Sequence, residues 1–290
     1  MRRIAIIGLG LIGGSMGLAL KKAQGKELEL VGFARRPEAA SIALGIGAVD
    51  RAEGDLISTV KDVDLVLIAT PAMAIKEVLT QIGDSLSQGC IVTDTASTKA
   101  QVMAWAQELL PPSVGFIGGH PMAGKETFGI RAADADLFRG CIYCLIPGEN
   151  ASNQAIDLVT GLVNQIGANP LFLDASEHDS LVAAVSHLPL LLSTALVTTT
   201  TKSPSWPQMA RLAASGFRDL TRLASGNPEM SRDICLTNKE PILRWIDEFI
   251  TELREFRRRI SEEDKELEQI FLGAREQRER WLRQMGKERA

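Results

Sequence analysis

Cysteine, histidine and tyrosine are scarce in this chain of 290 residues, which contains four, three and one of them. Four cysteines are too few to hold a chain of this length together by disulfides. Cys141 and Cys144 have the CxxC spacing of redox and zinc sites, but the stretch around them reads as a strand, where residues three apart point to opposite faces. No second cysteine or histidine pair lies near them in the sequence. We therefore expect core thiols and no metal site.

The sequence also lacks an excess of basic residues. Lysine and arginine number 32 against 36 aspartate and glutamate, which is a net charge of −4 without a basic block, so no nucleic-acid partner is expected. A hydrophobic fraction of 45% with 23% charged residues is typical of a soluble globular protein, and the length suits two domains. Because a strand pattern begins at once, with no targeting segment before it, we expect a cytoplasmic protein.

The longest apolar run, residues 181–197, lacks the composition of a membrane span. Polar residues and a proline interrupt it and basic residues do not flank it, so no membrane association is expected. We predict instead a buried helix of a helical domain. Pro189 has no backbone N–H and frees the carbonyl of Val185, which predicts a kink beside His187.

Short apolar runs alternate with helical patterns up to about residue 174, which predicts an α/β fold with a doubly wound, Rossmann-type parallel sheet. Besides the first strand, the expected strands are residues 29–33, 64–69, 91–93, 114–117, 141–146 and 171–173. From Ser176 onward only helical periodicity continues. We therefore predict a dinucleotide-binding domain at residues 1–174 and an all-helical substrate and dimerisation domain at residues 175–290.

Two helix starts are expected in the second domain. Ser176 with Asp179 three residues later resembles a capping box. The sequence Ser261-Glu262-Glu263 precedes a stretch with apolar residues at near-heptad spacing. This last amphipathic helix needs a surface to pack on, and either the same chain or a dimer partner would provide it.

The first fifteen residues read as a buried strand, a glycine turn and the start of a helix. Gly8 permits the tight turn, Gly10 lets the backbone approach a phosphate, and Gly13 allows the helix to pack closely on the strand. The helix N-terminus, at Leu11 and Ile12, adds free amides and a positive dipole. This GxGxxG spacing after an apolar strand predicts a dinucleotide site, and a purely structural turn is the alternative.

Arg35 and Arg36 follow the second strand, where an NAD-selective site would place an acid for the ribose 2′-hydroxyl. Guanidinium groups pair with phosphate oxygens, so the two arginines favour the 2′-phosphate of NADP, with NAD still possible. Solvated loop residues are the alternative. Thr70 and Pro71 follow the strand at residues 64–69, and we expect them to line the cofactor.

Three further segments could carry chemistry. Ser97 follows the strand at residues 91–93, and it either caps a helix or aims its hydroxyl at a substrate. His120 lies among glycines, where an imidazole could exchange a proton with a substrate hydroxyl near neutral pH. Arg218 and Arg222 stand four apart on one helical face, and they either receive carboxylates or form a solvated basic stripe.

Taken together and in this order, these motifs resemble those of the prephenate and arogenate dehydrogenase family of tyrosine biosynthesis. The matching segments are residues 8–15, 94–99, 118–124 with Glu126, 186–189 and 216–222, so the resemblance covers nearly the whole chain. It implies a homodimer formed through the helical domain, with each active site between the two domains.

The resemblance makes His120 the catalytic histidine, hydrogen-bonded to the C4 hydroxyl of the substrate, and Ser97 its partner near the nicotinamide. Hydride would leave C4 for the cofactor as His120 takes the hydroxyl proton. Loss of the C1 carboxylate as CO₂ would make the ring aromatic, so the protein would mainly position groups.

The resemblance also implies a set of substrate-binding residues. Arg222 and Arg218 would hold substrate carboxylates, and His187 lies in one of the matching segments. Glu126 and Asp179 are candidates to pair with those arginines or with a substrate amine.

One position departs from the family pattern. Many members that use prephenate have a second histidine three residues after the first, where this chain has Leu190. An imidazole there could donate to the keto group of prephenate and leucine cannot, whereas the ammonium of arogenate needs a carboxylate. We therefore expect arogenate to be used better than prephenate.

Three alternatives stay open at this point. One is a prephenate-specific NAD(P) dehydrogenase. Another is a β-hydroxy acid dehydrogenase with a catalytic lysine, although the sequence lacks the glycine-rich lysine helix that such an enzyme needs. The third is a catalytically silent NADP-sensing dimer, which would not need Ser97, His120 and Arg222 together.

Overall fold

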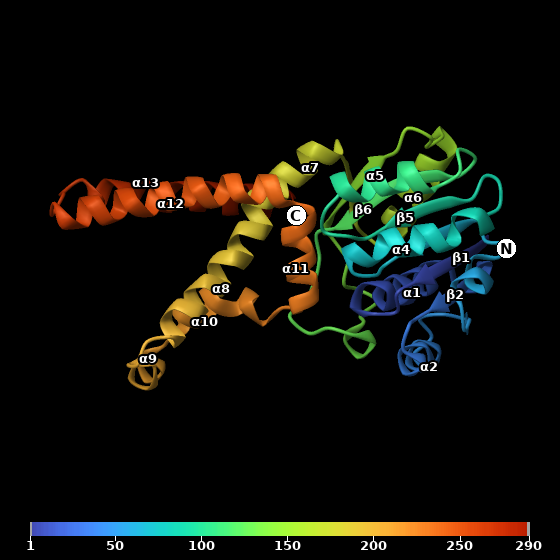
Figure 1. The fold of residues 1–290 in the computed structure, drawn as a ribbon, viewed down its shortest axis with the longest axis horizontal. Coiled ribbons are helices and arrows are strands. Elements are labelled where there is room, and N and C mark those ends of the chain that lie inside the picture. The colour runs from blue at the N-terminus through green and yellow to red at the C-terminus, as the bar shows by residue number, and fades with distance from the viewer. Residues whose placement is uncertain (1, 289–290) are drawn as a thin grey trace. The chain divides into compact units, whose positions relative to one another are not determined.

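The structure is a computed structural model and describes residues 2–288. By its internal contacts the chain divides after Ile242 into two compact units, which are described separately below. The first unit holds a sheet, its covering helices and a helical segment (Figure 1). The second unit, from Leu243 onward, is helical.

Within residues 2–288, eight strands form one sheet in the order β3-β2-β1-β4-β5-β6-β7-β8. Their bounds are β1 Arg2–Ile7, β2 Leu28–Phe33, β3 Arg51–Ala52, β4 Leu65–Ile68, β5 Ile91–Asp94, β6 Gly115–Pro121, β7 Ile142–Pro147 and β8 Asn169–Phe172. Strand β3 has only two residues, too few to leave a pattern in the sequence. The predicted doubly wound α/β fold is confirmed.

Strand direction changes at the end of the sheet. The first six strands are parallel as predicted, but β7 runs antiparallel to β6, and β8 follows the direction of β7. A parallel neighbour needs a long crossover connection, usually a helix. Between β6 and β7 the structure has only a short 3₁₀ turn, Ile130–Ala132. The chain therefore returns beside β6 in the opposite direction.

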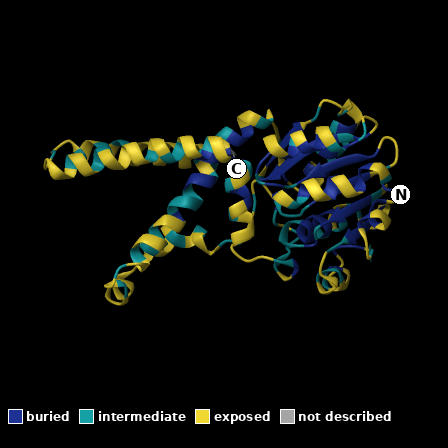
Figure 2. Cartoon of the chain, in the orientation of Figure 1, coloured by how far each residue is buried: buried dark blue, intermediate teal, exposed yellow. Residues whose placement is uncertain are grey.

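Helices cover both faces of the sheet because its central strands are apolar on both sides. Ile4 and Ile6 of β1 pack into one core cluster, and Ala5 and Ile7 pack into the other. This alternation is the pleat of a buried parallel strand, and it explains the continuous apolar run in the sequence (Figure 2). The first cluster includes α1 Leu11–Gln24, α2 Pro37–Gly45 and α6 Asn153–Gln165, and the second α3 Leu56–Val60, α4 Ala72–Ile82 and α5 Ala100–Leu109.

The four cysteines are free thiols. Cys144 of β7 is buried and Cys141, just before that strand, is half-buried. Burial raises the pKa of the Cys141 thiol to about 11, which leaves it protonated and unreactive at neutral pH. The prediction of core thiols is therefore confirmed for Cys144 and holds in part for Cys141.

The segment after β8 is helical, as predicted. It contains α7 Ala175–Val182, a π-helical turn at Ala183–His187, α8 Leu188–Thr201, α9 Trp206–Leu212, α10 Ser215–Thr221, a 3₁₀ turn at Arg222–Ser225 and α11 Pro228–Thr237. Pro189 lies at the start of α8, where its ring crowds the carbonyl four residues earlier. The sequence predicted a kink beside His187, and the structure has a π-helical turn at this point.

The continuous helical stretch Ala175–Thr201 is more exposed than predicted. Its most apolar window has a mean hydropathy of 1.8, so the stretch could cross a membrane by length and composition, yet only 28% of that window is buried. Val185 is 73% exposed and Leu181 52%. The sequence predicted a buried helix, which is wrong for the single chain. Hydrophobic patterning indicates that a surface needs cover, but not which molecule covers it.

The second unit is a helical hairpin. Helix α12, Lys239–Ser261, which begins in the first unit, and α13, Leu267–Glu288, contact each other through the rings of Phe256 and Phe271, whose centroids are 6.0 Å apart. The predicted start signal at residues 261–263 is wrong, because α12 continues to Ser261 and Glu263 adopts a positive φ of 52° in the turn that follows. The last helix therefore packs within its own chain, while Phe271 stays 62% exposed.

Candidate active site

The predicted site residues gather where parallel strands end. In the sheet register Ile7 of β1 lies beside Phe33 of β2 and Ile68 of β4, and Ile68 lies beside Asp94 of β5. The turns that follow these strands are therefore neighbours at one edge. Ligands of open α/β sheets bind at this carboxyl edge.

The three glycines of the turn after β1 have different surroundings. Gly8 has a φ of +102°, and a Cβ there would lie 2.5 Å from the carbonyl oxygen of Ala69. A Cβ at Gly13 would lie 2.1 Å from the carbonyl oxygen of Gly8. In contrast, a Cβ at Gly10 would meet no atom within 4 Å. Packing thus explains Gly8 and Gly13, whereas Gly10 faces open space.

Helix α1 begins at Leu11 directly after this turn, with its N-terminal amides uncapped. Its N-cap residue Gly10 makes no side-chain hydrogen bond, and its first turn has no acid. The first helical bond is donated by Gly14 to the carbonyl of Gly10 at 3.0 Å, so the amides of Leu11, Ile12 and Gly13 precede the ladder. These donors and the helix dipole suit a pyrophosphate.

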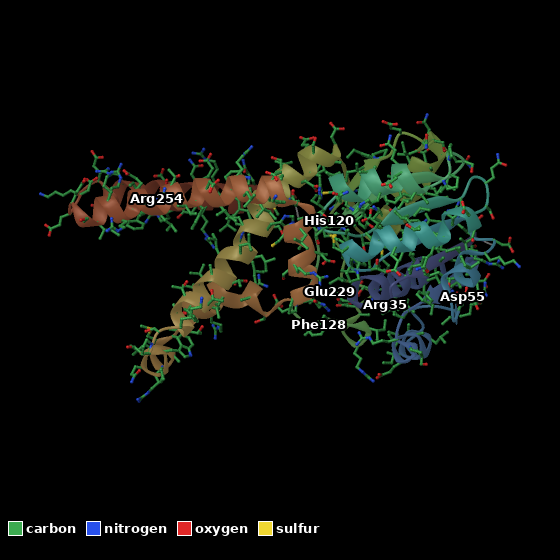
Figure 3. The ribbon with its side chains drawn as sticks, in the orientation of Figure 1. Arg35, Asp55, His120, Phe128, Glu229 and Arg254 are labelled. Atoms are coloured by element: carbon green, nitrogen blue, oxygen red, sulfur yellow. The ribbon has the colours of Figure 1, made fainter. Side chains whose placement is uncertain are left out.

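Two further segments at this edge have the properties expected of a dinucleotide site. Thr70 and Pro71 follow β4, and the buried hydroxyl oxygen of Thr70 has no hydrogen-bond partner among the described residues. Arg35, which Figure 3 labels, and the adjacent Arg36 lie exposed between β2 and α2. Within residues 2–288 neither guanidinium lies within 4.0 Å of a carboxylate. Both arginines are therefore available for a phosphate.

A buried ion pair holds the end of β6 in place. The Asp94 carboxylate contacts the Lys99 ammonium, and both side chains are fully buried. Lys99 Nζ donates to the carbonyl of Gly119 at 2.7 Å, and the Gly119 amide donates to Asp94 Oδ1 at 3.1 Å. Burial lowers the pKa of Lys99, and the Asp94 charge opposes this shift. The two side chains thus bind both polar backbone groups of the residue before His120.

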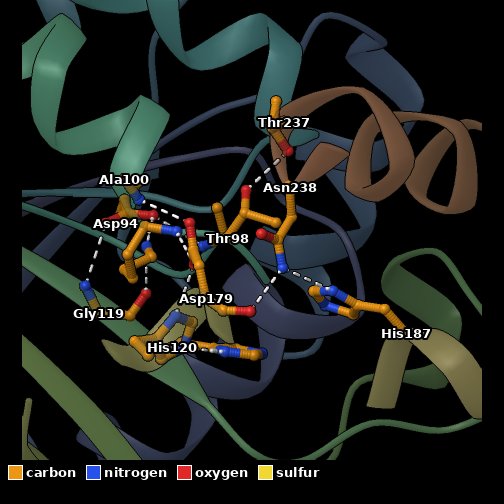
Figure 4. A network of polar contacts seen from close by, with 12 residues as sticks. Asp94, Thr98, Ala100, Gly119, His120, Asp179, His187, Thr237 and Asn238 are labelled. Carbon is orange, nitrogen blue, oxygen red and sulfur yellow. Dashed lines mark hydrogen bonds and ion pairs between the residues drawn. The ribbon is translucent and has the colours of Figure 1, made fainter. Parts of the chain in front are cut away.

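His120 is the penultimate residue of β6, which extends four residues beyond its expected end. The residue is 7% exposed, and its Nδ1 lies 2.8 Å from Nε2 of His178 (Figure 4). His178 Nδ1 in turn lies 2.8 Å from Oδ1 of Asp179. Burial is the main cause that lowers the pKa of His120 well below 6.5, and the nearby Lys99 ammonium lowers it further. His120 is therefore a neutral imidazole at pH 7 that can accept a proton.

Asp179 has a structural role that the sequence did not predict. Its Oδ1 accepts the Lys99 amide at 2.7 Å and its Oδ2 the Ala100 amide at 2.8 Å, so this carboxylate of α7 caps the N-terminus of α5. The expected capping box with Ser176 is wrong, because the N-cap of α7 is Asp174. Asp179 thus accepts from two backbone amides and lies beside His178, and no arginine lies within 4.0 Å of it among the described residues.

Ser97 lies in the bend between β5 and α5 and is partly buried. It does not cap α5, because the N-cap residue is Lys99 and Asp179 binds the first amides. The neighbouring Thr98 hydroxyl lies 2.8 Å from that of Thr237. Of the two roles predicted for Ser97, the helix cap is thus removed and a ligand contact remains.

His187 is buried in the π-helical turn. Its Nδ1 lies 3.1 Å from Nδ2 of Asn238, which also donates to the carbonyl of Asp179 at 2.8 Å. Its Nε2 is buried without a partner among the described residues. Burial lowers the pKa of His187 to about 4. This imidazole is therefore neutral at pH 7.

The two candidate arginines separate in the structure. Arg222 begins the 3₁₀ turn after α10 and forms an ion pair with Glu126, which lies in the loop after β6. Arg218 is 80% exposed and has only a 3.6 Å contact with the adjacent Asp219. The structure thus joins Arg222 to Glu126 and leaves Arg218 in solvent.

Comparison with known proteins decides the family. Residues 16–171 match the nucleotide-binding domain of prephenate dehydrogenase, and residues 174–272 match the prephenate dehydrogenase dimerization domain. Prephenate dehydrogenase from Bacillus subtilis is 38% identical over 288 residues, which are 98% of this chain and 77% of that protein. The chain belongs to the prephenate dehydrogenase family.

Solved structures agree with this family assignment. Prephenate dehydrogenase from Aquifex aeolicus, in complex with hydroxyphenyl propionate and NAD⁺, is 28% identical with a TM-score of 0.89, covering 97% of this chain and 98% of that one. Arogenate dehydrogenase from Synechocystis is 29% identical with a TM-score of 0.81, covering 96% and 99%. This prephenate dehydrogenase family member is therefore an oxidoreductase with a nucleotide-binding domain and a small-molecule substrate.

Sequence reasoning missed three residues of this family member's site. Lys99 was noted only as part of a loop, and its burial against Asp94 depends on the fold. His178 was recognised as one of three histidines, but its contact with His120 joins residues 58 positions apart. Asn238 carried no signal. The adjacent pair His178-Asp179 is the one feature of the sequence that could have suggested a histidine held by a carboxylate.

Proposed function

We propose that this protein catalyses the oxidative decarboxylation of arogenate, and less efficiently of prephenate, with hydride transfer to NADP. The observation that supports this most is His120, which is buried, neutral and hydrogen-bonded to His178. It stands at the carboxyl edge of the sheet, where the glycine turn and the uncapped α1 terminus also lie.

The residues of this edge fit a dinucleotide. The turn of Gly8, Gly10 and Gly13 with the amides of Leu11 and Ile12 would hold the pyrophosphate, because Gly10 leaves open space in front of those donors. Thr70, whose hydroxyl lacks a partner among the described residues, and Pro71 would line the nicotinamide half. Arg35 and Arg36 would bind the 2′-phosphate of NADP. The bound cofactor supplies a hydride acceptor.

The chain's own residues would then handle one proton and one carboxylate. His120 takes the proton of the C4 hydroxyl as the C4–H bond gives up its hydride, which leaves a carbonyl at C4. The bond from C1 to the carboxylate then breaks with release of CO₂, and its electron pair completes the aromatic ring while the C4 oxygen becomes a phenolate. That oxygen takes the proton back from His120, which restores the neutral imidazole. Ser97, free of the helix cap, would contact the same hydroxyl.

Substrate recognition rests on Arg222, Glu126, His187 and Leu190. Arg222 would hold a substrate carboxylate, because a guanidinium pairs with carboxylate oxygens bidentately. Glu126, its partner in the free protein, would pair with the ammonium of arogenate. His187 presents an unpartnered Nε2, and Leu190 offers no donor to a ketone. Because Asp179 already accepts from two backbone amides and contacts His178, we assign the ammonium of arogenate to Glu126.

Use of prephenate with NAD is the second candidate, and two of the similar proteins support it. The relative from Bacillus subtilis is a prephenate dehydrogenase, and the Aquifex aeolicus structure carries NAD⁺. The first candidate is supported instead by Arg35 and Arg36, which favour NADP, and by Leu190, which favours arogenate.

We further propose that the protein is a cytoplasmic homodimer with a dinucleotide-binding domain at residues 1–174 and a helical domain at residues 175–290. The match of residues 174–272 to a dimerization domain supports the dimer. The exposed apolar stretch Ala175–Thr201 supports it as well, because a partner subunit would cover surface that one chain leaves bare.

The test is to measure kcat/KM for arogenate and prephenate, each with NAD and NADP. We expect arogenate with NADP to be best. Arg35→Ala with Arg36→Ala should abolish the preference for NADP, whereas Arg211→Ala, an exposed arginine of α9, should not. A preference for prephenate, or an unchanged cofactor ratio in the double variant, would favour the second candidate.

A further inference from the structure

Three side chains form a hydrogen-bonded chain that ends on His120. His178 is fully buried and uses both ring nitrogens: Nδ1 faces Asp179 Oδ1 and Nε2 faces His120 Nδ1, each at 2.8 Å. The two rings meet edge-on, with centroids 5.1 Å apart and an interplanar angle of 71°. The positions of the hydrogens in this chain, which Figure 4 shows from close by, can be inferred from the group that can only accept hydrogen bonds.

The group that can only accept hydrogen bonds is the carboxylate of Asp179. Backbone amides of Lys99 and Ala100 donate into its two oxygens, and a backbone amide cannot act as acceptor. The group is therefore an acceptor at both oxygens, and His178 Nδ1 must carry a proton to bond with it. A neutral imidazole carries one N–H, so Nε2 of His178 is bare. That atom can only accept, which places the proton of His120 on Nδ1.

We propose that His178, held by Asp179, is a positioning residue that keeps the proton of His120 on Nδ1 and leaves Nε2 bare as the proton acceptor. This inference rests on the proposed role of His120 as the base. When the substrate proton reaches Nε2, His120 becomes an imidazolium whose Nδ1–H still donates to His178. The Asp179 carboxylate at the far end balances the new charge.

The hydrogen-bonded chain of Asp179, His178 and His120 forms only when β6, α7 and α5 pack together. His120 comes from β6, whereas His178 and Asp179 come from α7, and Asp179 reaches its position by capping α5. A fully protonated His178 would reverse the second bond, because its Nε2–H would donate to His120 Nδ1. His120 would then carry its proton on Nε2 and could not act as a base. The position of the His120 proton therefore distinguishes neutral His178 from protonated His178.

Nitrogen NMR of the ¹⁵N-histidine-labelled full-length protein tests this directly. The chain has three histidines, and single substitutions assign each ring. We expect both His120 and His178 to show a protonated Nδ1 and a bare Nε2. In His178→Phe, which has no acceptor, His120 should exchange between tautomers. In His178→Gln, whose amide oxygen can replace the Nε2 lone pair, the Nδ1–H form should persist.

Kinetics supply the second readout. His178→Phe should lower kcat by roughly a hundredfold or more, since loss of the residue that orients a catalytic histidine costs up to about 10⁴. The KM and the cofactor affinity should not change, and His178→Gln should recover much of the lost kcat. A merely structural role would move the melting temperature without this split or this rescue.

The failures of the two proposals differ. If His120→Asn keeps normal turnover, the proposed function is wrong. If His120→Asn is inactive but wild-type His120 carries its proton on Nε2, the proposed role of His178 is wrong. The same conclusion follows if folded His178→Phe keeps the wild-type kcat. If His178→Phe does not fold, the tautomers of His120 in the wild type and in His178→Gln still test the role of His178.

Discussion

Adding one methyl group at Gly10 or at Gly8 should separate cofactor binding from folding. Gly10 has a φ of −102° and a ψ of −154°, an extended conformation open to alanine, and its Cβ would meet nothing within 4 Å. Gly10→Ala should therefore fold normally. Its methyl group would occupy the space in front of the α1 amides where a phosphate approaches.

The expected loss of affinity follows from the hydrogen bonds that the methyl group displaces. One charge-assisted hydrogen bond is worth about 1.5–3 kcal/mol, which raises the Kd for NADP by about ten- to a hundredfold. Thermal unfolding without cofactor should show an unchanged Tm, while titration calorimetry with NADP shows the weaker binding.

Gly8→Ala is the matched control at the same turn. Its φ of +102° and the 2.5 Å approach to the Ala69 carbonyl force both backbone strain and overpacking, each worth about 1–3 kcal/mol. At about 2–4 °C per kcal/mol, the Tm should fall by about 5–20 °C. Wild-type affinity for NADP in Gly10→Ala, or an unchanged Tm in Gly8→Ala, would refute this assignment of the two glycines.

Three further outcomes are expected. Arg222→Ala should raise KM about tenfold or more through loss of a charge-assisted contact, whereas Arg218→Ala, which removes an exposed side chain, should not; an unchanged KM in Arg222→Ala would return that arginine to a solvated stripe. The kcat/KM should fall as the pH drops through a pKa below 6.5, because protonated His120 cannot accept a proton, and a limb above 6.5 would contradict the burial argument. Lys99→Met should destabilise the fold by about 3–5 kcal/mol through an unpaired buried carboxylate, and Lys99→Met with Asp94→Asn should regain part of this in denaturant unfolding; no regain would mean that the pair is uncoupled.

Much of the α/β half could be predicted because its signals are local. A strand buried on both faces is a continuous apolar run, and the glycine turn depends on backbone geometry within a few residues. The direction of β7 could not be predicted in this way, because it depends on the connection before it rather than on its own residues. The same holds for the exposure of Val185, since a hydrophobic pattern does not identify the covering molecule.

The site residues divide along the same line. Ser97 and the turn at Gly10 follow strands, and His120 lies near the end of one, so the sequence could locate all three. The role of Asp179 could not, because the pattern Ser176-x-x-Asp179 suggests a cap of its own helix whereas the carboxylate caps α5. Contacts between distant segments, such as those of Lys99 and His178, depend on how the sheet and the helical segment pack.

The most direct test of the central claim is to measure turnover and cofactor affinity together in His120→Asn. If His120 is the base, kcat with arogenate or prephenate should fall by about 10²–10⁴ while the Kd for NADP stays at the wild-type value, because the dinucleotide residues are untouched. Near-normal turnover in the folded variant would contradict the account.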